Sequence, residues 1–179
     1  MEPKVYIFRG APASGKGTVV PPFARQLPKP ITLIEQDKLR WGLHLIGRNI
    51  EDVTEEEHYF AFRNTLLLYE EYLKVRKYNI VLEGLFTWDD VVASQGNCKD
   101  LIGLAGLYNV PWKSIVLIAE KEELLRRNAA RPYATPPEEF ETLYNNIYSK
   151  IDPQEIVIDS SGKTPEQTLA ELTQKLAEV

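Results

Sequence analysis

The chain has 179 residues, of which 44% are hydrophobic and 26% are charged, and its formal net charge is −5. This balance is usual for a soluble globular protein with a real core, and it excludes a disordered chain, a collagen-like fibre and a coiled-coil rod. No apolar run approaches the ~20 residues that cross a bilayer. The acidic balance gives no overall attraction for long nucleic acid or anionic lipid. We therefore expect one domain over residues 1–179 with no membrane partner, and a long nucleic-acid partner is disfavoured but not excluded.

The cysteine content and the first residues indicate a compartment. Cys98 is the only cysteine, which excludes an internal disulfide and a multi-cysteine metal site. The chain starts Met-Glu-Pro-Lys and leads directly into a strand-like run, without the pattern of a secretory signal peptide. A reducing, cytoplasmic location is therefore the expectation.

Short runs rich in valine and isoleucine recur along the chain and alternate with stretches of helical periodicity. This alternation predicts an α/β fold, a five-stranded parallel sheet flanked by helices on both faces. We predict strands at Lys4–Phe8, Ile31–Glu35, Asn79–Glu83, Ser114–Ala119 and Glu155–Asp159.

Capping signals mark several of the helices between these strands. Thr54 with Glu57 forms a capping box, and the apolar positions after it recur every three or four residues, so we predict a helix to about Lys77. A second box, Thr164 with Gln167, begins the last helix. Further helices are expected over 98–108, 121–130 and 138–150.

The most specific motif follows the first strand, where a Gly-x4-Gly-Lys pattern matches the core of a phosphate-binding P-loop. Glycines let successive backbone N–H groups turn into one concavity, and the next helix adds the positive end of its dipole. Lys16 can then reach the β- and γ-phosphates of a nucleotide. The alternative is a glycine-rich turn without a ligand. The expected nucleotide-binding residues are Gly10, Ala11, Pro12, Ala13, Ser14, Gly15, Lys16, Gly17 and Thr18.

Two features depart from the strict pattern. Gly17 stands where a serine or threonine is expected, so Thr18 is the hydroxyl available to phosphate or Mg²⁺. Pro21 and Pro22 lie about one turn into the following helix, where each removes a backbone donor. We expect that helix to be kinked or displaced, without an effect on the phosphate-binding turn.

The run from Gly10 to Thr18 resembles the P-loop of adenylate-kinase-like nucleoside monophosphate kinases, which share its Gly-Lys-Gly-Thr ending. As a whole, the chain more closely resembles the small P-loop kinases related to polynucleotide 5′-kinase, chloramphenicol phosphotransferase and zeta toxin. The resemblance covers nearly the full length through four landmarks, of which the P-loop is the most specific. It implies a P-loop kinase fold that uses ATP and Mg²⁺, in a single domain with a short lid around residues 126–137.

The second landmark is Asp37, directly after the second strand, with Arg40 three residues later. Ligands of open α/β sheets lie beyond the carboxyl ends of the strands, so Asp37 should face the P-loop and accept the proton of a substrate hydroxyl. The related kinases place a base-like aspartate here. Arg40 suits a phosphate or carboxylate on the acceptor. The alternative makes Asp37 the N-cap of the next helix and Arg40 a surface charge.

The third landmark is Glu83 at the end of the third strand, followed by Gly84. A carboxylate beside a P-loop can hold Mg²⁺ through water, orient a nucleophile or contact the acceptor. Monophosphate kinases have Asp-Gly here and zeta-like kinases have Glu-Gly. We favour Glu83 as an acceptor or Mg²⁺-water contact, with a carboxylate that merely leaves the sheet as the alternative. The following Trp88, Asp89 and Asp90 either line the acceptor pocket or cap the next helix.

The fourth landmark follows the fourth strand, where Arg127 and Arg131 are four residues apart and share one helix face. Kinases of this superfamily place a lid here, and its arginines neutralise charge on the transferring phosphoryl group. The resemblance therefore implies catalytic roles for Arg127 and Arg131 ahead of Arg126. The alternative is a solvated basic face paired with Glu122 and Glu123.

Together these landmarks predict an enzyme that transfers the γ-phosphoryl group of ATP to a hydroxyl of a small-molecule or nucleotide acceptor. Lys16, Asp37, Arg127 and Arg131 are the expected catalytic residues. Asp37, Arg40 and Glu83 are expected at the acceptor, and Thr18 and Glu83 at the metal. Two alternatives stay open: a nucleoside monophosphate kinase, and a nucleotide-binding regulator without an acceptor. The acceptor and the oligomeric state cannot be predicted from the sequence.

Overall fold

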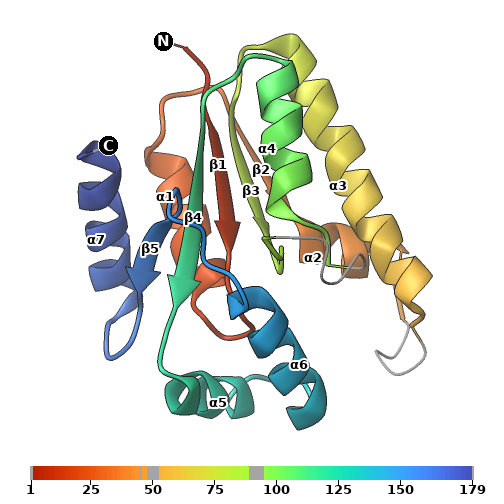
Figure 1. Cartoon of the computed structure of the whole chain (residues 1–179), viewed down its shortest axis with the longest axis vertical. Helices are drawn as coiled ribbons and strands as arrows, with labels where there is room; N and C mark the ends of the chain where they lie inside the picture. The colour runs from red at the N-terminus through yellow and green to blue at the C-terminus, as the bar shows by residue number, and fades with distance from the viewer. Residues whose placement is uncertain (1, 45, 48–52, 89–94, 179) are drawn as a thin grey trace.

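Five parallel strands form the centre of the computed structural model, which describes residues 2–44, 46–47, 53–88 and 95–178. The strand order is β2-β3-β1-β4-β5 (Figure 1). The strands are β1 Val5–Arg9, β2 Ile31–Glu35, β3 Asn79–Gly84, β4 Trp112–Ile118 and β5 Ile156–Asp159. The predicted fold class is confirmed, and each predicted strand is present to within two residues at either end.

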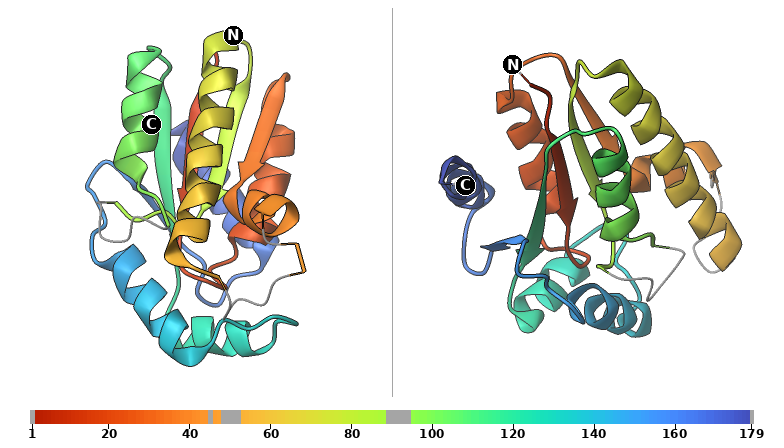
Figure 2. Two further views of the ribbon diagram at one scale, coloured as in Figure 1. Left: turned by 90° about the vertical axis from the view of Figure 1, so that its right-hand side faces the viewer. Right: turned by 45° about the horizontal axis from the view of Figure 1, so that its top comes forward.

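Helices cover both faces of this sheet, because alternate residues of each strand point to opposite faces. Ile7 of β1 packs in one core with α3 and α4, whereas Phe8 packs in a second core with α1 and α7. Figures 1 and 2 show these two layers. The helices are α1 Lys16–Gln26, α2 Gln36–Leu39, α3 Glu55–Val75, α4 Cys98–Leu107, α5 Lys121–Ala129, α6 Pro137–Tyr148 and α7 Pro165–Ala177, and a π-helical turn, η1, spans Arg40–His44.

Both predicted capping boxes are present, at Thr54 with Glu57 and at Thr164 with Gln167. Helix α3 ends at Val75, two residues before the predicted end, because Arg76 adopts a left-handed conformation with φ 52°. Helix α1 continues through Pro21 and Pro22 as one element of 11 residues, so the two prolines do not end it. A kink or displacement there stays a prediction.

Helices α5 and α6 lie beyond the carboxyl ends of the strands, at the bottom of Figure 1 and in both views of Figure 2. This is the edge of the sheet where the P-loop leaves β1. The end of α6 is attached to that strand through Arg9, whose fully buried guanidinium pairs with Glu155 at 2.6 Å and donates to the carbonyl oxygens of Ile147 and Lys150. The strand that carries the P-loop and the helix after the predicted lid are thus held together.

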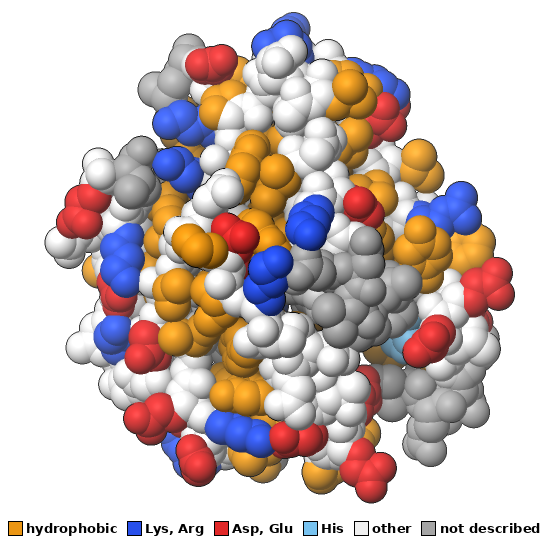
Figure 3. Space-filling model, in the orientation of Figure 1, with side chains coloured by type: hydrophobic (Ala, Val, Ile, Leu, Met, Phe, Trp, Pro, Cys, Tyr) orange, Lys and Arg blue, Asp and Glu red, His pale blue; other side chains and the backbone are white. Residues whose placement is uncertain are grey.

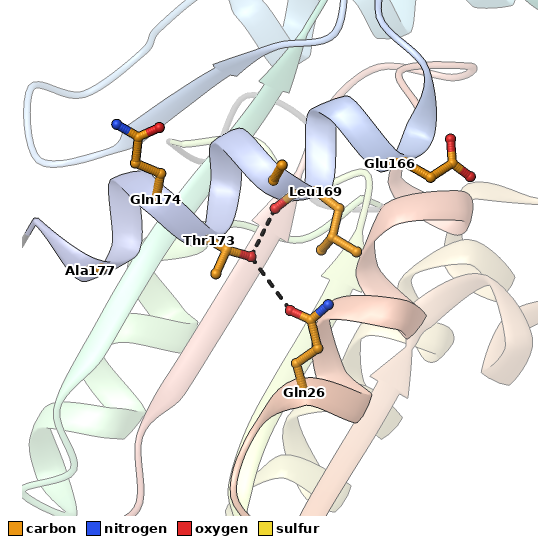
Figure 4. A pocket seen from close by; sticks show the side chains of 7 residues that line it. Gln26, Glu166, Leu169, Thr173, Gln174 and Ala177 are labelled. Carbon is orange, nitrogen blue, oxygen red and sulfur yellow. Dashed lines mark hydrogen bonds between the residues drawn. The ribbon is translucent and has the colours of Figure 1, made fainter.

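Helix α7 packs beside α1 on the opposite side of the sheet from α3 and α4. Thr173 Oγ1 of α7 lies 3.5 Å from Gln26 Oε1 of α1, across the shallow groove drawn in Figure 4. Acidic and basic side chains are interspersed over the face shown in Figure 3. Among the described residues, no helix combines the length and the apolar character needed to cross a bilayer.

Candidate active site

The P-loop connects β1 to α1 and follows the conformation that its sequence predicts. A side chain at Gly10 would place its Cβ 2.5 Å from the carbonyl oxygen of Leu117 on β4, so only glycine fits there. Gly15 has φ 95° and stands immediately before the first turn of α1. Ser14 Oγ is buried and has no hydrogen-bond partner within the described residues. An unpaired buried hydroxyl beside a helix N-terminus fits a phosphate ligand.

Lys16 is buried at the start of α1, and its ammonium lies inside the loop. Nζ donates to the carbonyl oxygens of Gly10 at 2.7 Å and Ala11 at 3.2 Å, and lies 3.9 Å from Glu83 Oε1. Burial lowers the pKa of Lys16, whereas the nearby carboxylates of Glu83 and Asp37 act in the opposite direction. The ammonium therefore sits where it can turn from these carbonyls to a phosphate.

Glu83 is placed beside this lysine by the register of the sheet, since it pairs with Phe8 of β1 and with Glu35 of β2. Its side chain is 10% exposed. Burial raises the pKa of Glu83 to about 7, although the charge of Lys16 opposes this change. A carboxyl group with a pKa near neutrality can exchange protons under ordinary conditions.

Asp37 and Arg40 form one unit, and this overturns the alternative interpretation of both residues. The N-cap position of α2 is Glu35, without a side-chain cap, so Asp37 lies inside the first turn and does not cap the helix. Arg40 is 2% exposed and is not a surface charge. Its Nη1 donates to Asp37 Oδ1 at 2.8 Å. The half-exposed carboxylate of Asp37 is therefore oriented by a buried guanidinium, whose charge is already partnered.

The three arginines of the predicted lid segment differ from one another in their surroundings. Arg127 donates to Ser160 Oγ at 3.0 Å and to the Ser160 carbonyl oxygen at 2.7 Å, and it pairs with Glu123 at 2.6 Å. Arg126 is exposed and lies 3.7 Å from Glu123, so part of the alternative, a basic face paired with acidic neighbours, is present. Arg131 is exposed, lines the same pocket as Lys16, and acts on the Lys16 charge. Arg131 is thus the arginine of this segment whose charge reaches the P-loop lysine.

One open pocket of about 1600 Å³ brings most of the predicted residues together at the carboxyl edge of the sheet. Its walls include Pro12 to Thr18 of the P-loop, together with Asp37, Arg40, Glu83, Arg127 and Arg131. Gly10 and Ala11 do not line it. Instead, their carbonyl oxygens accept from Lys16, and the Ala11 amide donates to the hydroxyl of Tyr148 at 3.1 Å. Tyr148 OH in turn donates to the Leu117 carbonyl oxygen at 2.7 Å.

Several pocket residues were missed by the sequence analysis, above all Glu35, Trp41, His58, Tyr133 and Glu139. Glu35 carried a usable signal, because it ends a strand in the same way as Glu83. His58 and Glu139 lie in ordinary helical segments, and only the tertiary arrangement brings them to the pocket. Trp41 is half-buried, lines the pocket and packs edge-on against His58.

Two other expectations concern the loop after β3. Trp88 is buried in the core formed with α3 and α4, so it does not line the pocket. Asp89 and Asp90 lie outside the described residues. Ser160, in the loop after β5, lines the pocket and accepts from Arg127.

The oxygen atoms around the P-loop suit a magnesium ion bound together with a nucleotide. Thr18 Oγ1 is exposed in the pocket and donates to the Gly15 carbonyl oxygen at 2.9 Å. A side chain at Gly17 would meet nothing within 4 Å, so the missing hydroxyl leaves open space beside the loop. Mg²⁺ usually takes one or two protein oxygens and completes its shell with phosphate oxygens and water. Thr18 and Glu83 fit that pattern.

The strand order, the P-loop and the pocket at the carboxyl edge define a P-loop nucleotide-binding fold of the α/β class. The comparisons with known proteins agree. The family AAA_33, described as AAA domain, matches residues 5–144, and the chain belongs to this family. No curated protein matches the chain.

Solved structures similar to this chain include several kinases. Thymidylate kinase from Candida albicans is 16% identical with a TM-score of 0.65, over 99% of this chain and 92% of that one. Shikimate kinase from Aquifex aeolicus is 21% identical with a TM-score of 0.61, over 98% and 96%. APS kinase from Mycobacterium tuberculosis, solved with AMPPNP and APS, is 14% identical with a TM-score of 0.63, over 98% of both chains. At these identities the likeness establishes the fold.

Proposed function

We propose that this protein is an ATP-dependent phosphotransferase, which transfers the γ-phosphoryl group of ATP to a hydroxyl of a small-molecule or nucleotide acceptor. The observation that carries the proposal is that the P-loop lysine and two strand-end carboxylates surround one pocket. Lys16, Asp37 and Glu83 come from three separate elements, and their charges act on one another. A loop that only held a nucleotide and its metal ion could use Glu83 but would not need Asp37.

The nucleotide side of the pocket supplies positive charge and backbone donors. The P-loop amides and the N-terminus of α1 would hold the phosphates, as helix N-termini do in other P-loop proteins. Lys16 would leave its loop carbonyls and contact the β- and γ-phosphates. Arg131, on the segment 126–137 that we propose as a lid, would neutralise charge on the transferring group. Arg127 would hold the lid to the loop at Ser160.

The acceptor side supplies a proton acceptor. Asp37 lines the pocket, is half-exposed, and is held in place by Arg40 at 2.8 Å. It would take the proton of the acceptor hydroxyl as that oxygen approaches the γ-phosphorus. Glu83, which is more buried and closer to Lys16, is the second candidate for this role. Its other possible role is an outer contact to metal-bound water.

Mg²⁺ would be held by the nucleotide phosphates, by Thr18 or a water in the space beside Gly17, and by Glu83 through water. When bound, the ion neutralises charge on the β- and γ-phosphates. The chain's own contribution is to keep the hydroxyl of Thr18 and the carboxylate of Glu83 on the same side of the P-loop.

The narrower placement among P-loop kinases rests on the sequence resemblance to polynucleotide 5′-kinase, chloramphenicol phosphotransferase and zeta toxin. A nucleoside monophosphate kinase is the second candidate, and the Gly-Lys-Gly-Thr ending favours it. A regulator without an acceptor would leave the charges of Asp37 and Arg40 without a role.

The test is an ATP-consumption screen with purified protein and Mg²⁺. Candidate acceptors are nucleosides, nucleoside monophosphates, oligonucleotide 5′-ends, sugars, nucleotide sugars and aminoalcohols. We expect ADP to form in step with one phosphorylated acceptor class. The control is Lys16→Met, in which that activity should disappear. Tight ATP binding without acceptor-dependent turnover in any class would favour the regulator instead.

A further inference from the structure

The acceptor's charge class can be inferred from how charges are distributed around the pocket. Resting on the proposed function, we infer that the acceptor is an uncharged or amine-bearing hydroxyl compound that carries no phosphate or carboxylate group. Three features of the described residues around the pocket indicate this: most of its cations are already paired, one of its carboxylates is not, and two of its buried polar atoms lack partners.

Most of the positive side chains that line the pocket already have an acidic partner. Arg40 pairs with Asp37 at 2.8 Å, Arg127 with Glu123 at 2.6 Å, and Lys163 with Glu171 at 2.6 Å. Lys38 pairs with Glu35. Within the described residues, the cations left for a ligand's negative charge are Lys16 and Arg131, whose charges act on each other. Both are needed by the phosphates of the nucleotide.

Carboxylates line the same pocket beside these cations, and one of them has no partner in the described part of the chain. Glu139 of α6 lines the pocket, and the described residues offer it no ion-pair partner within 4.0 Å, although Arg40 acts on it from farther away. Glu83 is likewise unpaired except for Lys16 at 3.9 Å. Glu35 and Asp37 lie on the same wall. Glu35 and Asp37 are balanced by Lys38 and Arg40, so a phosphate or carboxylate on the acceptor would find no unpaired cation among the described residues of this wall and would lie near the unpaired Glu139, in a partly buried site where repulsion is weakly screened.

The polar atoms that still lack partners suit a neutral ligand. Arg40 Nε and His58 Nδ1 are buried and find no partner in the part of the chain that the structure describes, and both residues line this pocket. Burial and the Arg40 charge lower the pKa of His58, so its imidazole adds no positive charge at neutral pH. This part of the wall therefore offers the Arg40 Nε donor and the His58 ring nitrogen to hydroxyl groups of a ligand, and the indole of Trp41 to an apolar ring face.

The alternative is that Arg40 turns to bind an anionic acceptor, as its position in the sequence first indicated. That movement would break the contact between Arg40 and Asp37, which orients the proposed base. It would also leave Glu139 beside the new anion, because Glu139 is the other carboxylate that acts on Arg40. The geometry therefore favours an Arg40 that stays with Asp37 while a neutral or cationic acceptor binds next to it.

The first experiment identifies the acceptor without choosing it in advance. Purified protein is incubated with Mg²⁺, γ-labelled ATP and a small-molecule metabolite extract, and labelled products are identified by mass spectrometry. We expect the acceptor of the dominant product to be neutral or positively charged at neutral pH. A dominant acceptor that already carries a phosphate or carboxylate would overturn this inference but leave the phosphotransferase intact. No labelled product at all would overturn both.

The second experiment changes the charge of the wall. For the acceptor found, the ratio of kcat/KM for its carboxylate-bearing analogue to that for the parent compound is measured in Glu139→Lys and Glu139→Gln. We expect the ratio to rise at least ~10-fold in Glu139→Lys, since like-charge rejection is replaced by attraction. The rise should be smaller in Glu139→Gln. Glu138→Lys, an exposed neighbour outside the pocket, is the matched control and should leave the ratio unchanged. An unchanged ratio in Glu139→Lys would overturn the assignment.

Discussion

The buried carboxyl group of Glu83 makes the stability of this protein depend on pH in a predictable direction. Burial raises the pKa of Glu83 from 4.5 to about 7 in the folded protein. The folded state therefore binds this proton more tightly than the unfolded state does. Its stabilising contribution is complete below the unfolded value and is lost as the pH rises through about 7. The Glu83→Gln substitution keeps the shape of the side chain and removes the titration.

The size of this effect follows from the pKa change. One pKa unit corresponds to ~1.4 kcal/mol, so the change at Glu83 is worth about 3 kcal/mol of unfolding free energy. For a chain of this length, each kcal/mol moves the melting temperature by ~2–4 °C. Between about pH 5 and pH 8, the melting temperature of Glu83→Gln should therefore rise relative to that of the parent by ~6–12 °C.

The assay is thermal unfolding of the parent, Glu83→Gln and Glu56→Gln across that pH range. Glu56 is exposed on α3, and its variant should follow the parent at every pH. The relative rise should be confined to the Glu83 variant. If the parent and Glu83→Gln change in parallel with pH, then Glu83 does not hold a proton near neutrality, and its candidacy as a second base fails with it.

Three further predictions concern the transfer site. Asp37→Asn should lower the rate of phosphoryl transfer by ~10²–10⁴-fold and leave ATP affinity nearly unchanged, because only the proton acceptor is lost. Turnover assays and an ATP titration measure these two quantities. If the variant transfers phosphoryl groups at the rate of the parent protein, the base is Glu83 instead. The same variant should lose only ~1 kcal/mol of stability in urea unfolding, since its amide oxygen can still accept from Arg40. Thr18→Val should raise the Mg²⁺ concentration needed for half-maximal turnover by several-fold, and an unchanged Mg²⁺ dependence would remove Thr18 from the metal site. Tyr148→Phe should lower the free energy of unfolding in urea by ~1–3 kcal/mol, because the buried Ala11 amide is left without a partner. It should also raise the KM for ATP. A stability equal to that of the parent protein would show that a water molecule replaces the hydroxyl.

Local signals made the framework of the fold predictable. The strand at Ile31–Glu35 has the predicted bounds, and both capping boxes begin helices where expected, because capping and alternation depend on neighbouring residues. The P-loop was likewise predictable from spacing. Its glycine at position 10 could be recognised from the motif, but the clash with Leu117 that explains it comes from a strand more than a hundred residues away.

The properties of the site depended on contacts that no local pattern records. Asp37, directly after a strand, was a candidate helix cap. Helix α2 begins at Gln36 instead, so the carboxylate of Asp37 is free to accept from Arg40. Arg127 and Arg131 of the predicted lid had equal standing in the sequence. Arg127 is held by Ser160, 33 residues along the chain, which leaves Arg131 to face Lys16. The raised pKa of Glu83 likewise requires the packed sheet around it.

The central claim is that phosphoryl transfer from ATP takes place at the P-loop lysine. The most direct measurement is the single-turnover rate of γ-phosphoryl transfer to the identified acceptor, in the parent protein and in Lys16→Met. We predict a correctly folded variant whose rate is lower by at least ~10²-fold, the cost of removing one preorganised charge at the transferring group. Transfer by Lys16→Met at the parent rate would contradict the account.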